Sequence, residues 1–234
     1  MGDKHATERL AGDAAGIARA AALIESGRLV ALPTETVYGL AGRADRAEAV
    51  AAIYRAKGRP DFNPLIVHVP DVAAAERLAL FDDRARQLAA RFWPGPLTMV
   101  LPLAPDAAVA AAVTAGLPTI ALRCPAHPLM RAVLAESGLP LAAPSANRSG
   151  GVSPTSADHV LRTLDARIAA VLDGGPSARG LESTIVALRE NGWQLLRDGP
   201  VAGDDLEALL GAPLAVSETR IEAPGQLAQH PRPD

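Results

Sequence analysis

Four short polar segments of the sequence carry residue types that bind phosphate-bearing ligands. They are residues 34–36, residues 57–63 followed by His68, residues 144–151 followed by Ser153, and residues 181–184. Hydroxyl and backbone N–H groups donate hydrogen bonds to phosphate oxygens, and arginine pairs with two such oxygens at once. The same residue types are common in ordinary turns and helix caps, so a single segment indicates little. The recurrence of four segments favours a pocket where they converge.

The second segment places two cations in a turn of restricted backbone. Lys57 and Arg59 flank Gly58 in a turn that also contains two prolines, and residues 65–69, rich in β-branched side chains, follow. This apolar run predicts a buried strand that ends near His68. Open α/β sheets bind ligands at the mouths of their strands, which favours an anion site here. A solvated cationic loop after a helix remains the alternative.

Two further cations, Arg123 and Arg197, end predicted strands, whereas the common nucleotide motifs are missing. The sequence contains neither G-x-x-x-x-G-K-[ST] nor G-x-G-x-x-G after a strand, which argues against a P-loop or Rossmann site. It also lacks the G-x-S-x-G elbow of a serine hydrolase, and its five histidines show no metal-ligand spacing. We expect Cys124 to be a buried, inert thiol.

Composition narrows the class of protein. The chain has 234 residues, of which 49% are hydrophobic and only 3% aromatic, so its core must be built from Ala, Leu and Val. The net charge of −3 argues against a general nucleic-acid coat but permits a local basic cleft. A single cysteine excludes an internal disulfide and a cysteine-based zinc site. Without a long apolar run or a signal-peptide pattern, we expect a cytoplasmic protein with no membrane contact.

The hydrophobic patterns predict alternating helices and strands. We expect helices over residues 13–26, 45–57, 72–79, 83–92, 127–137, 156–164 and 204–210, and strands over residues 28–32, 65–69, 97–103, 118–123, 139–143, 168–172, 183–188 and 193–197. Asp45 and Glu48 have the spacing of a capping box, and Asn191-Gly192 predicts a late hairpin. Alternation followed by a hairpin indicates an α/β fold with a twisted mixed parallel and antiparallel sheet and helices on its faces.

Residues 13–210 are expected to form one domain. Residues 1–12 are polar and without periodicity, which predicts a disordered N-terminus. Residues 211–234 contain scattered prolines and polar residues, which predicts a linker-like C-terminal tail.

Five motifs, in a fixed order, resemble those of one protein family. They are PTETVYGL at residues 33–40, KGRP followed by NPLIVHV at residues 57–69, WPGPLT at residues 93–98, PSANRSG at residues 144–150 and ESTIV at residues 182–186. Together they closely resemble the YrdC/Sua5 family of L-threonylcarbamoyladenylate synthases, over about residues 13 to 200. The resemblance implies a twisted mixed sheet around a large basic cavity.

The resemblance also implies a reaction. Members of the family make threonylcarbamoyl-AMP and pyrophosphate from ATP, L-threonine and bicarbonate or CO2. The product passes to a tRNA threonylcarbamoyl transferase complex that modifies adenosine 37 of tRNA. By motif position, threonine is expected at Thr36, His68, Arg123 and Ser183, and ATP at Arg59, Asn63, Thr119, Ser145, Asn147, Ser153 and Arg197. Lys57 and Arg59 are expected to offset phosphate charge, together with Mg²⁺ brought by ATP and without a metal site of the protein's own.

The tail departs from the pattern of the longer members of the family. Their linker to a second domain has a tyrosine where Pro231 stands here, although Pro224-Gly225 and His230 match it. The sequence therefore resembles a long Sua5-type chain without its C-terminal domain, and its tail is expected to act either as a lid on the site or as a passive end.

Three other functions stay open at this point. Related modules make carbamoyl-adenylate from carbamoyl phosphate, and the cavity of such a domain could instead bind double-stranded or structured RNA, including tRNA, without chemistry. A structural role within the later tRNA-modifying complex is the third.

Overall fold

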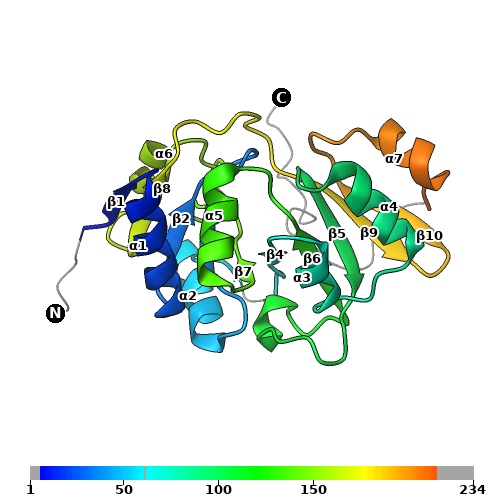
Figure 1. The fold of residues 1–234 in the computed structure, drawn as a ribbon, viewed down its shortest axis with the longest axis horizontal. Coiled ribbons are helices and arrows are strands. Elements are labelled where there is room, and N and C mark those ends of the chain that lie inside the picture. The colour runs from blue at the N-terminus through cyan, green and yellow to red at the C-terminus, as the bar shows by residue number, and fades with distance from the viewer. Residues whose placement is uncertain (1–5, 61, 215–234) are drawn as a thin grey trace.

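The ten strands within the described residues join in one twisted sheet (Figure 1). The computed structural model describes residues 6–60 and 62–214. The strands are β1 (Glu8–Ala11), β2 (Val30–Leu32), β3 (Gly39–Arg43), β4 (Ile66–His68), β5 (Leu97–Pro102), β6 (Thr119–Arg123), β7 (Leu141–Ala142), β8 (Ala170–Asp173), β9 (Thr184–Arg189) and β10 (Gly192–Arg197). Their order across the sheet is β1-β8-β2-β3-β7-β4-β6-β5-β9-β10.

The sheet mixes both strand directions, which confirms the predicted fold class. β8 pairs in parallel with β1 and β2, β4 with β6, and β5 with β9. The remaining neighbours are antiparallel, including the predicted β9–β10 hairpin.

Seven α-helices in the described part of the chain flank this sheet. They are α1 (Ala14–Glu25), α2 (Ala47–Lys57), α3 (Val72–Glu76), α4 (Asp83–Phe92), α5 (Pro128–Ser137), α6 (Ala157–Leu164) and α7 (Gly203–Leu210), with a 3-10 turn at Ala111–Val113. α1 and α5 lie side by side over one end of the sheet, and α4 and α7 lie together near the other (Figure 1). Under α1 and α5, residues such as Ile24, Leu32 and Val133 form a fully buried cluster.

The two faces of the central strands have different surroundings. On β6, Ile120 and Leu122 join the largest core cluster, whereas Ala121 joins a small cluster on the opposite face. Because side chains alternate along a strand, Arg123 lies on the same face as Ala121. The strand register pairs Arg123 with His68 of β4. The small apolar face therefore leads to a polar edge of the sheet.

Two of the predicted helix ends are confirmed, and the capping box is wrong. Asp13 caps α1 by accepting the N–H of Gly16, and Gly58 ends α2 in the left-handed conformation at φ 60°. The N-cap residue of α2 is Arg46, which makes no side-chain capping bond. Asp45 instead accepts two hydrogen bonds from Arg43, because a bidentate guanidinium competes well for a carboxylate.

The prediction of disorder over residues 1–12 is wrong for Glu8–Ala11. These residues form β1, which pairs with β8, and Arg9 makes ion pairs with Asp158 and Asp173. The stabilising partners lie about 160 positions away in the sequence, so local composition gave no sign of them.

The start of the predicted tail is ordered against β10. Trp193 donates its indole N–H to the carbonyl of Gly211, and its own carbonyl accepts the N–H of Leu214. The residues that match the family linker lie outside the described part of the chain. No helix within residues 6–60 and 62–214 is long and apolar enough to cross a membrane.

Candidate active site

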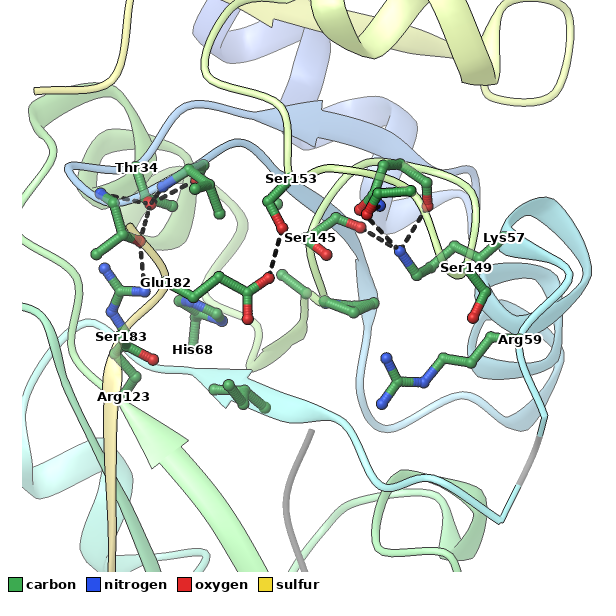
Figure 2. Close-up of a pocket in the computed structure, with 18 of the residues that line it drawn as sticks. Thr34, Lys57, Arg59, His68, Arg123, Ser145, Ser149, Ser153, Glu182 and Ser183 are labelled. Atoms are coloured by element: carbon green, nitrogen blue, oxygen red, sulfur yellow. Dashed lines mark hydrogen bonds between the residues drawn. The ribbon is translucent and has the colours of Figure 1, made fainter. Parts of the chain in front are cut away.

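A cavity of about 180 Å³ opens at the polar edge of the sheet, where the four predicted segments meet. Figure 2 shows its two halves. Thr34, His68, Arg123 and Ser183 gather at one end, and Lys57, Arg59 and Ser149 gather at the other, with Glu182, Ser145 and Ser153 between them. The cavity thus offers two adjacent binding regions, which we call the carboxylate corner and the phosphate corner.

Arg123 is the centre of the carboxylate corner, defined by Thr36, His68, Arg123 and Ser183. All four side chains are buried and line the cavity. Arg123 donates from Nη1 to the hydroxyl of Thr36 at 2.9 Å and from Nε to the carbonyl of Gly95 at 3.3 Å. The four residues that were predicted to bind threonine therefore lie together in the cavity.

Glu35, which was quoted in a motif but given no role, holds the other side of this arginine. Its carboxylate accepts Nη2 of Arg123 at 2.6 Å and the backbone N–H of Ala126 at 3.1 Å. Burial alone would raise the pKa of Glu35, but the Arg123 guanidinium outweighs it and holds that pKa below its ordinary value. The guanidinium is thereby fixed in orientation before any ligand arrives.

Thr34 orients Thr36 from the same loop. Its hydroxyl shares a 2.8 Å hydrogen bond with the hydroxyl of Thr36 and donates to the carbonyl of Val37 at 2.7 Å. Gly39 follows at a close approach, since a Cβ there would lie 3.3 Å from that of Ala143. The sequence analysis assigned threonine binding to Thr36 and gave Thr34 no role.

His68 is an uncharged member of the corner. Burial, reinforced by the nearby Arg123, lowers the pKa of His68 to about 3. Its Nδ1 is buried and has no hydrogen-bond partner among the described residues. A neutral imidazole with an unused ring nitrogen can accept or donate one hydrogen bond to a ligand without adding charge.

Ser183 connects the carboxylate corner to Arg197. The Ser183 hydroxyl shares a 2.7 Å hydrogen bond with Thr98 and accepts Nη2 of Arg197 at 3.0 Å. Arg197 also donates from Nε to the carbonyl of Ser183 at 2.9 Å. The two predicted ligand sets therefore share a border.

The phosphate corner is the loop of residues 145–153 with Arg59 and Arg197. Ser145, Ser149, Ser153 and two consecutive glycines line the cavity there. These hydroxyls and backbone groups suit the oxygens of a phosphate chain.

Lys57 supports this loop from behind. Its ammonium group donates to the backbone carbonyls of Ser145 and Asn147, the latter at 2.6 Å. Burial, reinforced by the charge of Arg59, lowers the pKa of Lys57 to about 7. The Asn147 amide donates to the carbonyls of Arg148 and Gly151 at 2.9 and 2.7 Å. Lys57 and Asn147 therefore fix the conformation of the loop by hydrogen bonds to its backbone carbonyls.

Arg59 and Asn63 carry unsatisfied atoms. Arg59 donates to the carbonyl of Pro64 at 3.0 Å, but its Nε and the Oδ1 of Asn63 are buried without a hydrogen-bond partner in the part of the chain that is described. Buried polar atoms without a hydrogen bond are rare in proteins, and such atoms usually bind a further group. Asn63 is not among the residues that line the cavity.

Thr119 does not reach the cavity. It shares a face of β6 with Arg123 but stands at the opposite end of the strand, paired with Pro102 of β5. Apart from Asn63 and Thr119, the predicted residues all line the cavity, and Thr119 lies at the far end of β6.

Glu182 was quoted as part of a motif but assigned no role. Its carboxylate accepts the hydroxyl of Ser153 at 2.6 Å and pairs with Nη1 of Arg197. No group of three or more His, Cys, Asp or Glu side chains that could hold a metal ion occurs within residues 6–60 and 62–214.

Comparison with known proteins gives a consistent result. The sequence model of the Sua5/YciO/YrdC family, described as telomere recombination, matches residues 22–199. The threonylcarbamoyl-AMP synthase of Bacillus subtilis is 50% identical over 206 residues, which cover 88% of this chain and 59% of that protein. The synthase of Pyrococcus abyssi is 43% identical over 221 residues, which cover 92% of this chain and 64% of that protein.

A solved structure agrees with the fold in detail. The crystal structure of P. abyssi Sua5 complexed with L-threonine superposes with a TM-score of 0.89 at 40% identity, covering 96% of this chain and 68% of that one. This chain spans about three fifths of the length of these two synthases. The match of sequence model, relatives and structure over most of its length shows that the chain belongs to the Sua5/YciO/YrdC family.

Proposed function

We propose that this chain makes threonylcarbamoyl-AMP and pyrophosphate from ATP, L-threonine and bicarbonate or CO2. The observation that carries the proposal is the cavity itself, in which a fixed arginine with hydroxyl neighbours borders a hydroxyl-rich, cationic loop. The family relationship and the names of the two synthases support the same reaction.

Threonine would bind in the carboxylate corner. Arg123, held by Glu35 and Gly95, presents a planar guanidinium that matches a carboxylate. Thr36 and Ser183 would add hydroxyl contacts, and the neutral His68 would meet a polar group of the amino acid. The complex of P. abyssi Sua5 with L-threonine supports threonine as the amino acid that is bound.

ATP would place its phosphates in the phosphate corner. Ser145, Ser153 and Arg197 would contact phosphate oxygens, and the orphaned Nε of Arg59 would gain an acceptor. Lys57 and Asn147 would act by holding the loop in shape. The structure offers no cavity contact for Thr119, so we do not include it.

The reaction needs no covalent bond between the protein and its substrates. The amine of threonine combines with CO2 to form a carbamate, and a carbamate oxygen attacks the α-phosphorus while pyrophosphate leaves. The described residues would align the two anions and offset their charge. Mg²⁺ carried by ATP would add charge neutralisation, and the oxygen donors of Glu182, Ser145 and Ser153 are the type that Mg²⁺ prefers.

The product would serve a later enzyme. A mixed anhydride of a carbamate and AMP is an activated acyl donor, which fits transfer to the adenosine of a tRNA by a threonylcarbamoyl transferase complex. Direct contact of this chain with structured RNA is a separate matter that no observation here favours.

Release of pyrophosphate tests the proposal. The chain is incubated with Mg²⁺, ATP, bicarbonate and each amino acid in turn, with CO2-depleted buffer as the control. We expect release that requires both L-threonine and bicarbonate. Release supported by carbamoyl phosphate without threonine would show a carbamoyl-adenylate module instead.

A further inference from the structure

Glu182 stands out as a negative charge among the cations of the cavity. Among the described residues that line it, four are Lys or Arg and Glu182 alone is Asp or Glu. Its side chain is 32% exposed and that of Arg197, its ion-pair partner, is 14% exposed, so the pair is substantially withdrawn from water.

Its position is fixed from several sides. One oxygen accepts the Ser153 hydroxyl at 2.6 Å, and the other accepts Nη1 of Arg197. Arg197 is in turn anchored to the carbonyl of Ser183. Burial alone would raise the pKa of Glu182, but Arg197, Ser153 and Lys57 outweigh it and keep that pKa below its ordinary value. The carboxylate is therefore ionised at neutral pH.

The partners of Glu182 are the same groups that the proposed function assigns to ATP. Ser153 has one hydroxyl hydrogen and cannot donate it to Glu182 and to a phosphate at the same time, whereas the guanidinium of Arg197 has five N–H donors and can bind both. A phosphate that takes the hydrogen bond of Ser153 therefore displaces the carboxylate from it. A displaced carboxylate that stays in the cavity lies beside the triphosphate, and like charges at close range repel strongly where water is scarce.

Building on the proposed function, we propose that Glu182 determines which form of the nucleotide binds. Its carboxylate binds groups that the proposed function assigns to phosphate, and it admits the triphosphate only together with Mg²⁺. Glu182 and the phosphates would hold the ion, which would supply the positive charge that offsets their repulsion. Mg²⁺ is commonly held in this way, by one or two carboxylates plus substrate phosphates.

Equilibrium binding of ATP tests this inference without turnover. Calorimetry measures the dissociation constant of ATP with EDTA and with Mg²⁺, for the wild-type chain and for Glu182→Gln. We expect metal-free ATP to bind the wild type at least about 10-fold more weakly than Mg²⁺–ATP. In Glu182→Gln metal-free ATP should bind about 10-fold more tightly than to the wild type, so that the two forms become nearly equal.

Matched variants separate charge from general disturbance. Glu35→Gln removes a carboxylate from the other ion-paired arginine, but Glu35 does not line the cavity, so the ratio of the two dissociation constants should stay as in the wild type. Glu182→Asp keeps the charge and should keep the ratio. If Glu182→Gln does not fold, as judged by thermal unfolding, Glu182→Ala takes its place with the same expected result.

The outcomes distinguish the inference from the function it rests on. A wild-type chain that releases pyrophosphate from threonine and bicarbonate, but binds both forms of ATP equally, contradicts the inference alone. If Glu182→Gln loses the same affinity for metal-free ATP as for Mg²⁺–ATP, the inference is also contradicted, because Glu182 would then only position Arg197. A chain that binds ATP in neither form contradicts both proposals.

Discussion

Buried charges of the cavity are held by partners within the protein. Arg123 forms an ion pair with Glu35 and Arg197 forms one with Glu182, whereas Lys57 donates hydrogen bonds to backbone carbonyls. An unpaired buried charge is very costly, so each of these groups needs a partner even without a ligand. The partner determines whether the group is available to a substrate.

Arg123→Lys tests the carboxylate corner. Lysine keeps the charge but loses the planar pair of donors, and a charge-assisted hydrogen bond contributes about 1.5–3 kcal/mol, or roughly 10- to 150-fold in affinity. Threonine binding should weaken by this factor while ATP binding changes little. Arg59→Ala should show the reverse pattern. Unchanged threonine affinity by calorimetry would remove Arg123 from the site.

Lys57→Met tests the supporting role of Lys57. The substitution leaves the carbonyls of Ser145 and Asn147 without their buried donor, which should cost about 1–3 kcal/mol of unfolding free energy. ATP affinity should fall and threonine affinity should not. Arg55→Met, on the exposed side of the same helix, is the control and should change neither. Full stability with lost ATP binding would instead place Lys57 directly on the phosphates.

His68 gives a pH dependence of stability. Its pKa is about 3 in the folded chain against an ordinary 6.5, so below pH 6.5 the unfolded chain takes up a proton that the folded chain refuses. The free energy of unfolding should therefore fall as the pH drops from 6.5 towards 3, by up to about 1.4 kcal/mol per pH unit from this group. Urea unfolding at several pH values should show that the unfolding free energy of His68→Gln depends on pH less steeply than that of the wild type, by this amount. Equal slopes would mean that His68 titrates normally in the folded chain.

At the scale of elements, the sequence predicted the strands and turns that have a clear local residue pattern of their own. Residues 65–69 are rich in β-branched side chains and contain β4, and Asn191-Gly192 marks the β9–β10 turn. β3 was missed because Gly39–Arg43 contains two glycines, and it is stable only between β2 and β7. Strands of this kind depend on distant partners that local patterns do not show.

The β9–β10 pair brings Ser183 and Arg197 together through a close backbone contact. A Cβ on Gly199 would lie 2.4 Å from the nitrogen of Thr184 and 2.7 Å from the carbonyl oxygen of Glu182. Gly199→Ala should therefore separate the two segments, with a loss of about 1–3 kcal/mol in unfolding free energy and reduced binding of both substrates.

Gly203→Ala is the matched control for this variant. Its Cβ would meet only Leu195 at 3.9 Å, and alanine suits the first turn of a helix. Thermal unfolding should show no loss of stability for this change. A Gly199→Ala chain as stable and active as the control would contradict the close contact.

At the scale of the whole molecule, one cavity combines four cations with a single carboxylate among its described lining residues, in a chain with a net charge of −3. Four of the five motifs contribute residues to this cavity, because they meet at the same edge of the sheet. They did not reveal Glu35 and Glu182 as partners, since the sequence shows which cations could meet a ligand but not which carboxylates hold them in its absence. A motif position does not tell which end of a strand faces the cavity, so the assignment of Thr119, which does not line it, stays a prediction.

The identity of the adenylate formed by this chain tests the central claim most directly. ATP, L-threonine and ¹³C-bicarbonate are incubated with the chain, and the nucleotide products are separated rapidly and weighed by mass spectrometry. We expect an AMP adduct whose mass includes one threonine and one labelled carbon. An adenylate that lacks the label or the threonine, or the absence of any adenylate while ATP remains bound, would contradict the account.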